Sequence, residues 1–185
     1  ATEKQALRDR YGKTEFGQRC LLARRLAEAG VPLVNISYCH TPSGSWDTHS
    51  RNFTKMKDSL APTLDQSLSA LIEDLDERGM LDETLVVVNA EFGRTPKINQ
   101  RLGRDHWPEA WSLCMAGCGI QRGLVLGKTT PNGAWVDGTE YDIGHIFHTV
   151  FEAMDIDPVA TEYHNNDQPL PIAHDDCGAI QELLA

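Results

Sequence analysis

The alternation of short apolar strands with amphipathic helices constrains the fold of this chain more than any other feature of its sequence. Residues 31–38 and 84–90 are short, β-branched and mostly apolar, which is typical of strands buried in a sheet. Apolar side chains recur at helical spacing through residues 14–29, before the first strand, and through residues 53–75, between the two strands. This alternation predicts an α/β fold with a mainly parallel sheet flanked by helices.

Other elements are predicted from residues that start, interrupt or stop secondary structure. Pro62 removes one backbone donor, so it should kink or restart the long helix, and Gly79 should end it. Thr139 is expected to open a last helix, with an acidic residue three positions later completing a capping box. Residues 111–116 and 124–126 are predicted as weaker strands.

Composition describes one ordinary soluble globular domain, which we expect to span residues 1–185. The chain is 41% apolar and 24% charged, and no apolar run reaches the ~18 residues of a membrane-spanning helix. The net charge of −10 argues against binding to nucleic acid or to an anionic membrane surface. Five scattered cysteines do not predict a disulfide framework.

Two predicted loops contain the candidate metal-binding and catalytic residues. In open parallel sheets, ligands collect beyond the carboxyl ends of the strands, and each loop follows one of the two best strands. The first loop contains Asp47 and His49, and the second contains further candidates: Glu91, Arg94, Asp105 and His106. Carboxylates and imidazoles drawn from separate loops suit a divalent metal such as Zn²⁺, Mn²⁺, Fe²⁺ or Ca²⁺.

Each candidate also has an ordinary structural interpretation that the sequence leaves open. Asp47 could bond nearby loop amides, as Asp often does in loops rich in Ser and Thr. Asp105 and His106 could form a surface turn or support a metal site from outside its ligand set. Arg94 is either a solvated charge or a clamp for phosphate or sulfate. His145 and His148 are not on the apolar face of the last helix, so we expect both to face solvent.

Several long motifs resemble DUF1501, a large bacterial sulfatase-like family of unknown function placed within the alkaline phosphatase superfamily. The motifs are W-D-T-H (46–49), L-D-E-R-G-x-L-D-E-T-L-V-V-V (75–88), E-F-G-R-T-P (91–96) and G-R-D-H-W-P (103–108). The resemblance covers nearly the whole chain and implies the same mainly parallel α/β sheet. Hydrolases of that superfamily hold two metals at strand ends with Asp and His ligands, beside a Ser, Thr or modified Cys nucleophile.

The resemblance implies metal-dependent hydrolysis of sulfate or phosphate esters. Asp47 and His49 match a ligand pair, Glu91 takes the place of an Asp, and Phe92 replaces the usual His of an Asp-His-Gly motif. Asp105 and His106 lie where a later His ligand is expected. The implied metal set is therefore Asp47, His49, Glu91, Asp105 and His106, with Arg94 acting catalytically by steadying the anionic group. The implied substrate is a small anionic ester or a sulfated glycan.

Family members are usually more than twice this length and carry an export signal. The resemblance therefore implies an exported or periplasmic parent protein, of which this chain is a carboxyl-terminal portion with weak or no activity alone. A second interpretation is a non-catalytic relative that binds a glycan or a protein at the strand-end cleft, since Trp46 and Trp107 flank the candidate ligands. A third is self-association through an exposed sheet edge.

Overall fold

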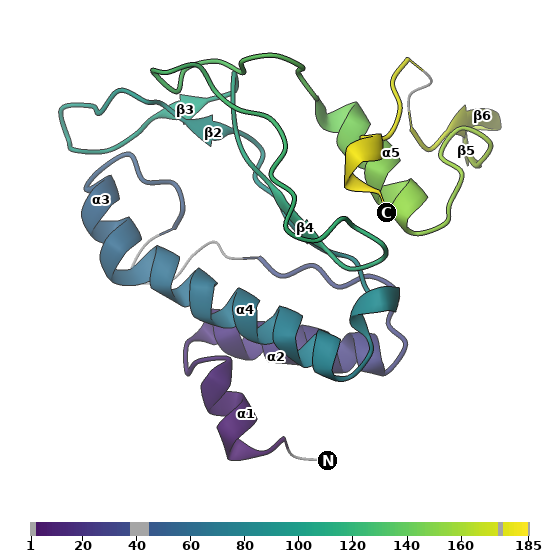
Figure 1. Ribbon diagram of the computed structural model, residues 1–185, viewed down its shortest axis with the longest axis horizontal. Helices are drawn as coiled ribbons and strands as arrows, with labels where there is room; N and C mark the ends of the chain where they lie inside the picture. Colours follow the sequence, from purple (N-terminus) through teal and green to yellow (C-terminus); the bar gives the residue numbers. More distant parts are fainter. Residues whose placement is uncertain (1–2, 38–44, 174–175, 185) are drawn as a thin grey trace. The chain divides into compact units, whose positions relative to one another are not determined.

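The computed structural model describes residues 3–37, 45–173 and 176–184, and it divides into two compact units (Figure 1). The first unit comprises residues 1–81 and 91–111, and the second comprises residues 82–90 and 112–185. The chain therefore leaves the first unit after residue 81 and returns to it at residue 91. All predicted metal ligands belong to the first unit.

Helices form most of the first unit: α1 (Gln5–Arg10), α2 (Glu15–Glu28), α3 (Asn52–Lys55) and α4 (Ala61–Glu77). A π-helical turn, η1 (Met56–Leu60), joins α3 to α4, so one continuous helix occupies the predicted position. Pro62 lies in the first turn of α4, directly after this π-helical turn, so the helix continues through the proline with a local change of helix type and without a restart. No helix within the described residues is long and apolar enough to cross a membrane.

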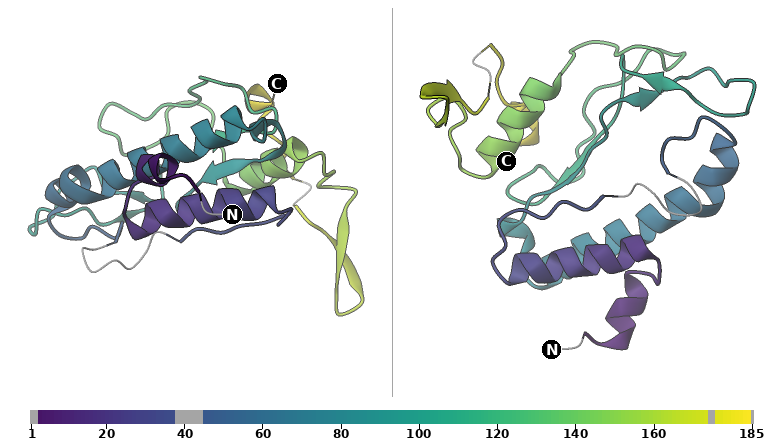
Figure 2. Two further views of the ribbon diagram at one scale, coloured as in Figure 1. Left: turned by 90° about the horizontal axis from the view of Figure 1, so that it is seen from below. Right: turned by 180° about the vertical axis from the view of Figure 1, so that it is seen from behind.

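The core of the first unit lies between α2 and α4, which run side by side in both views (Figures 1 and 2). Thr14 starts α2 by accepting a hydrogen bond from the Gly17 backbone N–H. Both helices bury small and aliphatic side chains against each other: Cys20, Leu21 and Ala23 from α2, and Ala70, Leu71 and Leu75 from α4. Removing these apolar surfaces from water is the main stabilisation of the pair.

A buried charged network crosses this core. Arg24 of α2 is fully buried, and its Nε lies 2.8 Å from Oδ2 of the buried Asp74 of α4. The Tyr11 hydroxyl donates to the same oxygen at 2.9 Å, and Arg78 Nε donates to Oδ1 at 2.6 Å. Burial acts to raise the pKa of Asp74, but these hydrogen bonds and the Arg24 charge outweigh burial and lower it.

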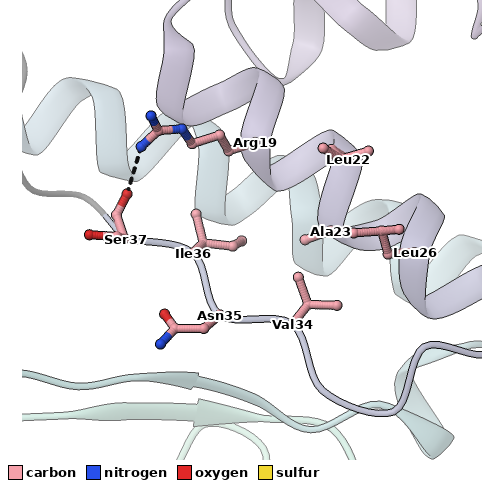
Figure 3. A pocket seen from close by; sticks show the side chains of 8 residues that line it. All are labelled: Arg19, Leu22, Ala23, Leu26, Val34, Asn35, Ile36 and Ser37. Atoms are coloured by element: carbon pink, nitrogen blue, oxygen red, sulfur yellow. Dashed lines mark hydrogen bonds between the residues drawn. The ribbon is translucent and has the colours of Figure 1, made fainter.

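The predicted strand at residues 31–38 forms no ladder: residues 31–37 are extended without a strand partner among the described residues, and residue 38 lies outside them. Its side chains still alternate, because Val34 and Ile36 face α2 whereas Leu33 is 83% exposed. A cavity of about 310 Å³ separates this segment from α2 (Figure 3). It is lined by Arg19, Leu22, Ala23, Leu26, Val34, Asn35, Ile36 and Ser37.

Short strand pairs and one helix shape the second unit. After a 3₁₀ turn, η2 (Leu81–Glu83), strand β1 (Val86–Val88) pairs with β4 (Cys114–Ala116), and β5 (Glu162–Asn165) pairs with β6 (Gln168–Pro171). Helix α5 (Ile143–Ala153) and a final 3₁₀ turn, η3 (Gln181–Leu183), complete it. The capping box of α5 uses Asp142 and His145, three residues beyond the predicted start at Thr139. Residues 124–126 form no strand.

The prediction of a mainly parallel sheet flanked by helices is wrong. The described residues contain three two-stranded antiparallel sheets, the third formed by β2 (Gly93–Arg94) and β3 (His106–Trp107). An apolar run predicts a strand but not which strand pairs with it or in which direction. Strand β1 is an example, because it pairs with β4 in an antiparallel sheet. Val86 and Val88 are half-buried while Val87 is 39% exposed, so one face of β1 is open, whereas a parallel sheet covers both faces.

A candidate metal site in the first unit

Two loops that are distant in sequence are tied together at this site. Three backbone hydrogen bonds join them: Arg51 N to Arg101 O, Asn52 N to Leu102 O, and Arg104 N to Thr48 O. A Cβ at Gly103 would lie only 2.0 Å from the carbonyl carbon of His49, so only glycine permits this approach. The loops therefore present residues 46–49 and 103–106 beside each other.

Asn99 is a positioning residue that the sequence analysis did not identify. Its Nδ2 donates to the carbonyl oxygen of His49 at 3.1 Å and to Oδ1 of Asp105 at 3.0 Å. Its Oδ1 accepts from the backbone N–H groups of Arg101 and Gly103, both at 2.9 Å. An Asn four residues before a glycine, inside a loop, is the signal that could have indicated such a turn.

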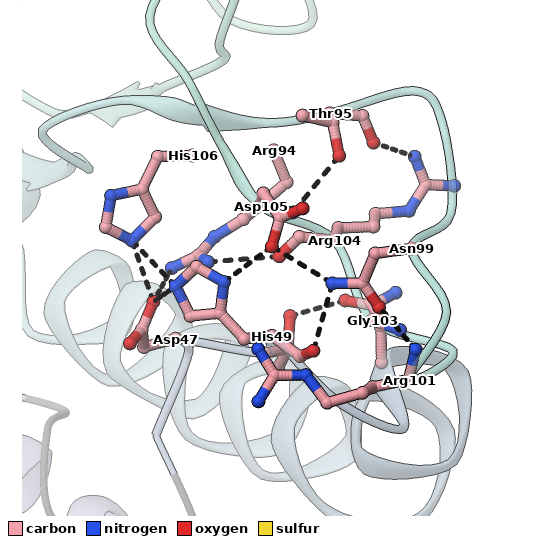
Figure 4. A network of polar contacts seen from close by, with 12 residues as sticks. Asp47, His49, Arg94, Thr95, Asn99, Arg101, Gly103, Arg104, Asp105 and His106 are labelled. Carbon is pink, nitrogen blue, oxygen red and sulfur yellow. Dashed lines mark hydrogen bonds and ion pairs between the residues drawn. The ribbon is translucent and has the colours of Figure 1, made fainter.

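The β2–β3 ladder places two of the candidates opposite each other. Arg94 is the register partner of His106, and Gly93 is the partner of Trp107. Directly opposed residues of an antiparallel pair project from the same face. Arg94 and His106 therefore both extend toward the first loop and reach the carboxylate of Asp47 (Figure 4).

Three donor atoms form a nearly equilateral triangle at the centre of the site. His49 Nε2 and His106 Nε2 are 3.2 Å apart, and Asp47 Oδ1 lies 3.1 Å from the first and 2.9 Å from the second. Ligands placed tetrahedrally at ~2.0–2.2 Å from a metal are separated by about 3.3–3.6 Å, slightly more than the distances in this triangle. Asp47, His49 and His106 thus form a cluster that could hold a metal ion.

Asp105 orients His49 from the side away from the triangle. His49 Nδ1 donates to Asp105 Oδ1 at 2.8 Å, because an ionised carboxylate can only accept. The unprotonated Nε2 of a neutral His49 then faces Asp47 Oδ1, which is also an acceptor. Two acceptors at this distance repel unless a proton or a metal cation neutralises them, and carboxylate–histidine–metal arrangements have this form.

Electrostatics keeps both carboxylates of the site ionised. The hydrogen bond from His106, followed by that from Arg94, lowers the pKa of Asp47 to about 2. The hydrogen bond from His49, followed by that from Asn99, lowers the pKa of Asp105. Both groups therefore carry negative charge at neutral pH, as cation binding requires.

Glu91 and Phe92 both follow β1, and Phe92 contacts residues of the site, whereas Glu91 is not part of the cluster. The Phe92 ring packs on the His106 ring with centroids 4.1 Å apart, and Arg94 Cζ lies 5.8 Å from its centroid. Phe92 thus supports two site residues although it cannot bind metal. The structure does not bring Glu91 into the cluster: its side chain is exposed, and no hydrogen bond or ion pair joins it to a described residue.

The two histidines of α5 differ from each other. His145 Nδ1 lies 2.8 Å from Asp142 Oδ1 at the start of the helix, outside the first unit. His148 is 2% exposed, so the expectation that it faces solvent is wrong. Its position off the apolar face of the helix did not indicate this burial.

A family model described as "Protein of unknown function (DUF1501)" matches residues 1–184. No curated protein and no solved structure matches the chain.

Proposed function

Because the chain belongs to DUF1501, whose description assigns no activity, function has to be inferred from the site, and we propose that this site binds a divalent cation and hydrolyses sulfate or phosphate esters. One observation carries the proposal. Two imidazole nitrogens and one carboxylate oxygen converge at mutual distances of 2.9–3.2 Å, with the second nitrogen of His49 held by Asp105. Nitrogen donors favour Zn²⁺ or Mn²⁺ over Ca²⁺, which prefers oxygen.

The roles of the protein residues follow from their contacts. Asp47, His49 and His106 would hold the cation, and Asp105 keeps the Nε2 lone pair of His49 directed into the site. A bound cation of this type supplies activated water or polarises an ester oxygen. Arg94 extends from β2 to the same carboxylate and presents a planar donor fork that suits sulfate and phosphate oxygens.

Water is the nucleophile in this proposal. Among the described residues, no Ser, Thr or Cys side chain hydrogen bonds to the side chains of Asp47, His49 or His106. The relationship to the alkaline phosphatase superfamily rests on the motif resemblance, and so does an exported or periplasmic location. A small anionic ester or a sulfated glycan is the substrate class that this resemblance and Arg94 support together.

Metal binding is the first test. We expect isothermal titration to show one Zn²⁺ or Mn²⁺ per chain, and we expect His106→Ala to weaken binding by at least about 100-fold, because it removes a ligand. His145→Ala is the matched control, since it removes a half-exposed, carboxylate-paired imidazole from the second unit. Equal binding by both variants would show that the cation does not use the triangle.

Turnover is the second test. With saturating metal, we expect weak hydrolysis of an aryl sulfate or aryl phosphate, as for a carboxyl-terminal portion of the parent protein, and we expect His106→Ala to abolish it and His145→Ala to retain it. Metal-dependent binding of the ester without turnover would remove the hydrolase part of the proposal and leave the metal site.

A non-catalytic role in binding a glycan is the second candidate. The packing of Phe92 against His106 favours it, because an aromatic ring stands where the superfamily motif has a second metal-ligating His. Aromatic faces are common in sugar and interface contacts. Stoichiometric metal together with turnover would exclude this candidate, whereas metal-free protein that binds a sulfated glycan would support it.

A further inference from the structure

Arg94 makes the shortest contact to the carboxylate of Asp47. Its Nη2 donates to Oδ1 at 2.6 Å, and the same oxygen lies 2.9 Å from His106 Nε2 and 3.1 Å from His49 Nε2. One carboxylate oxygen therefore lies within 3.1 Å of three nitrogens (Figure 4). The guanidinium supplies positive charge to this oxygen, which is also the oxygen that faces both imidazole nitrogens.

A divalent cation and the guanidinium compete for this position. Both are positive, so a dication that takes this oxygen repels the guanidinium, and a partly exposed ion pair holds the guanidinium only weakly against that repulsion. Asp47 is 52% exposed in this pair, so burial does not hold its carboxylate in place, whereas Arg94 is only 22% exposed. Cation binding at the triangle is therefore expected to release Nη2 of Arg94.

The released guanidinium would remain at the rim of the site. Arg94 Nη1 donates to the carbonyl oxygen of Arg104 at 3.3 Å, and Cζ lies 5.8 Å from the Phe92 ring centroid. The backbone of Arg94 is fixed by its ladder pairing with His106. A planar fork with free donors beside a cation is a ready site for a tetrahedral oxyanion, which can accept two parallel hydrogen bonds.

We propose that Arg94 is a latch on Asp47, released by the cation and then bound by a tetrahedral oxyanion, so that cation and oxyanion bind in that order and cooperatively. The inference rests on the proposed metal site and adds the regulation of that site. By linkage, the oxyanion also tightens cation binding in the same ratio, because it holds the guanidinium away from Asp47.

The cation affinity of an Arg94 variant tests the latch directly. We expect Arg94→Gln to bind Zn²⁺ on the order of tenfold tighter than the unmodified chain in sulfate-free buffer, since its competitor is gone. Arg101→Gln is the matched control: it removes one positive charge from the second loop, near Asp105 but not bonded to Asp47. Its Zn²⁺ affinity should stay within about twofold of the unmodified chain. Circular dichroism confirms that both variants are folded.

Sulfate binding gives the second, independent readout. The unmodified chain should bind sulfate much more tightly with Zn²⁺ than without it, and Arg94→Gln should lose this dependence. If the unmodified chain binds Zn²⁺ but Arg94→Gln binds it equally or more weakly, the latch is overturned and the metal site stands. If Arg101→Gln tightens binding as much as Arg94→Gln, general charge is the cause and the latch is also overturned. If the unmodified chain binds no Zn²⁺, the metal site and the latch fail together.

Discussion

Replacing Arg24 by Met tests whether the buried charged network stabilises the first unit. The Arg24 side chain is 0% exposed and that of Asp74 is 4% exposed, so the substitution leaves a buried carboxylate with one of its two counter-charges, Arg78. Breaking a buried ion pair costs ~3–5 kcal/mol. Asp74 keeps hydrogen bonds from Tyr11 and Arg78, which places the expected loss of unfolding free energy near the lower bound, about 3 kcal/mol.

The other two partners of Arg24 should add little to this loss. Glu3 and Glu28 each lie 2.5 Å from the guanidinium, but their side chains are 17% and 48% exposed. When the guanidinium is removed, water can therefore solvate both carboxylates. A loss of about 3 kcal/mol lowers the urea midpoint by on the order of 1–3 M. It also raises the unfolded fraction by roughly 100-fold.

Arg10→Met is the matched control, because it breaks an ion pair of similar length in the same unit. Arg10 Nη2 lies 2.6 Å from Glu73 Oε2, but the two side chains are 39% and 59% exposed, so the expected cost is below about 1 kcal/mol. Urea unfolding followed by tryptophan fluorescence suits the comparison, since Trp46, Trp107 and Trp111 belong to the first unit. Equal losses in the two variants would refute the argument that burial, and not distance, sets the cost.

Three further outcomes are expected. Burial acts to raise the pKa of Asp74, but hydrogen bonds and nearby positive charges lower it below the value of about 4 that the carboxyl has in the unfolded chain. The ionised carboxylate therefore stabilises the fold at neutral pH, and this stability is lost as the pH falls below about 4. Urea midpoints measured from pH 7 to pH 3 should fall less steeply for Asp74→Asn than for the unmodified chain. Asp105→Ala should weaken Zn²⁺ binding by about 10–100-fold in calorimetry, since it removes the partner of His49 Nδ1, and unchanged affinity would contradict its role. Gly103→Ala should weaken Zn²⁺ binding by at least about tenfold, because the new methyl group forces the two loops apart, whereas Gly178→Ala, with nothing within 4 Å of its added Cβ, should bind normally.

Local features of the sequence predicted the helices well. The spacing of apolar residues along 53–75 predicts the η1–α4 helix, and the position of Pro62 marks where its π-helical turn ends, because both depend on neighbours within one or two turns. The sheet was not predictable in this way. The apolar run at 84–90 contains β1, but its antiparallel partner β4 lies beyond a long connection, and no local pattern selects that partner.

The candidate site was predicted in part. Asp47, His49 and His106 share the triangle because the two loops meet, as expected, although the sheet expected to bring them together is absent. The site depends instead on Gly103 and Asn99, whose importance is in backbone contacts that residue types alone do not reveal. Glu91 adjoins the motif that contains Arg94, but adjacency in sequence does not determine the direction of a side chain.

The tie between the two loops has a practical consequence for identifying the ion. His49 and His106 are 57 residues apart in the sequence, so their paired nitrogens exist only while the first unit is folded. Any ion that binds to them must therefore stabilise the folded first unit and raise its melting temperature. Each tenfold increase of the free ion concentration above the dissociation constant adds about 1.4 kcal/mol to the free energy of unfolding. A thermal-shift series across divalent salts would rank the candidate ions without a substrate.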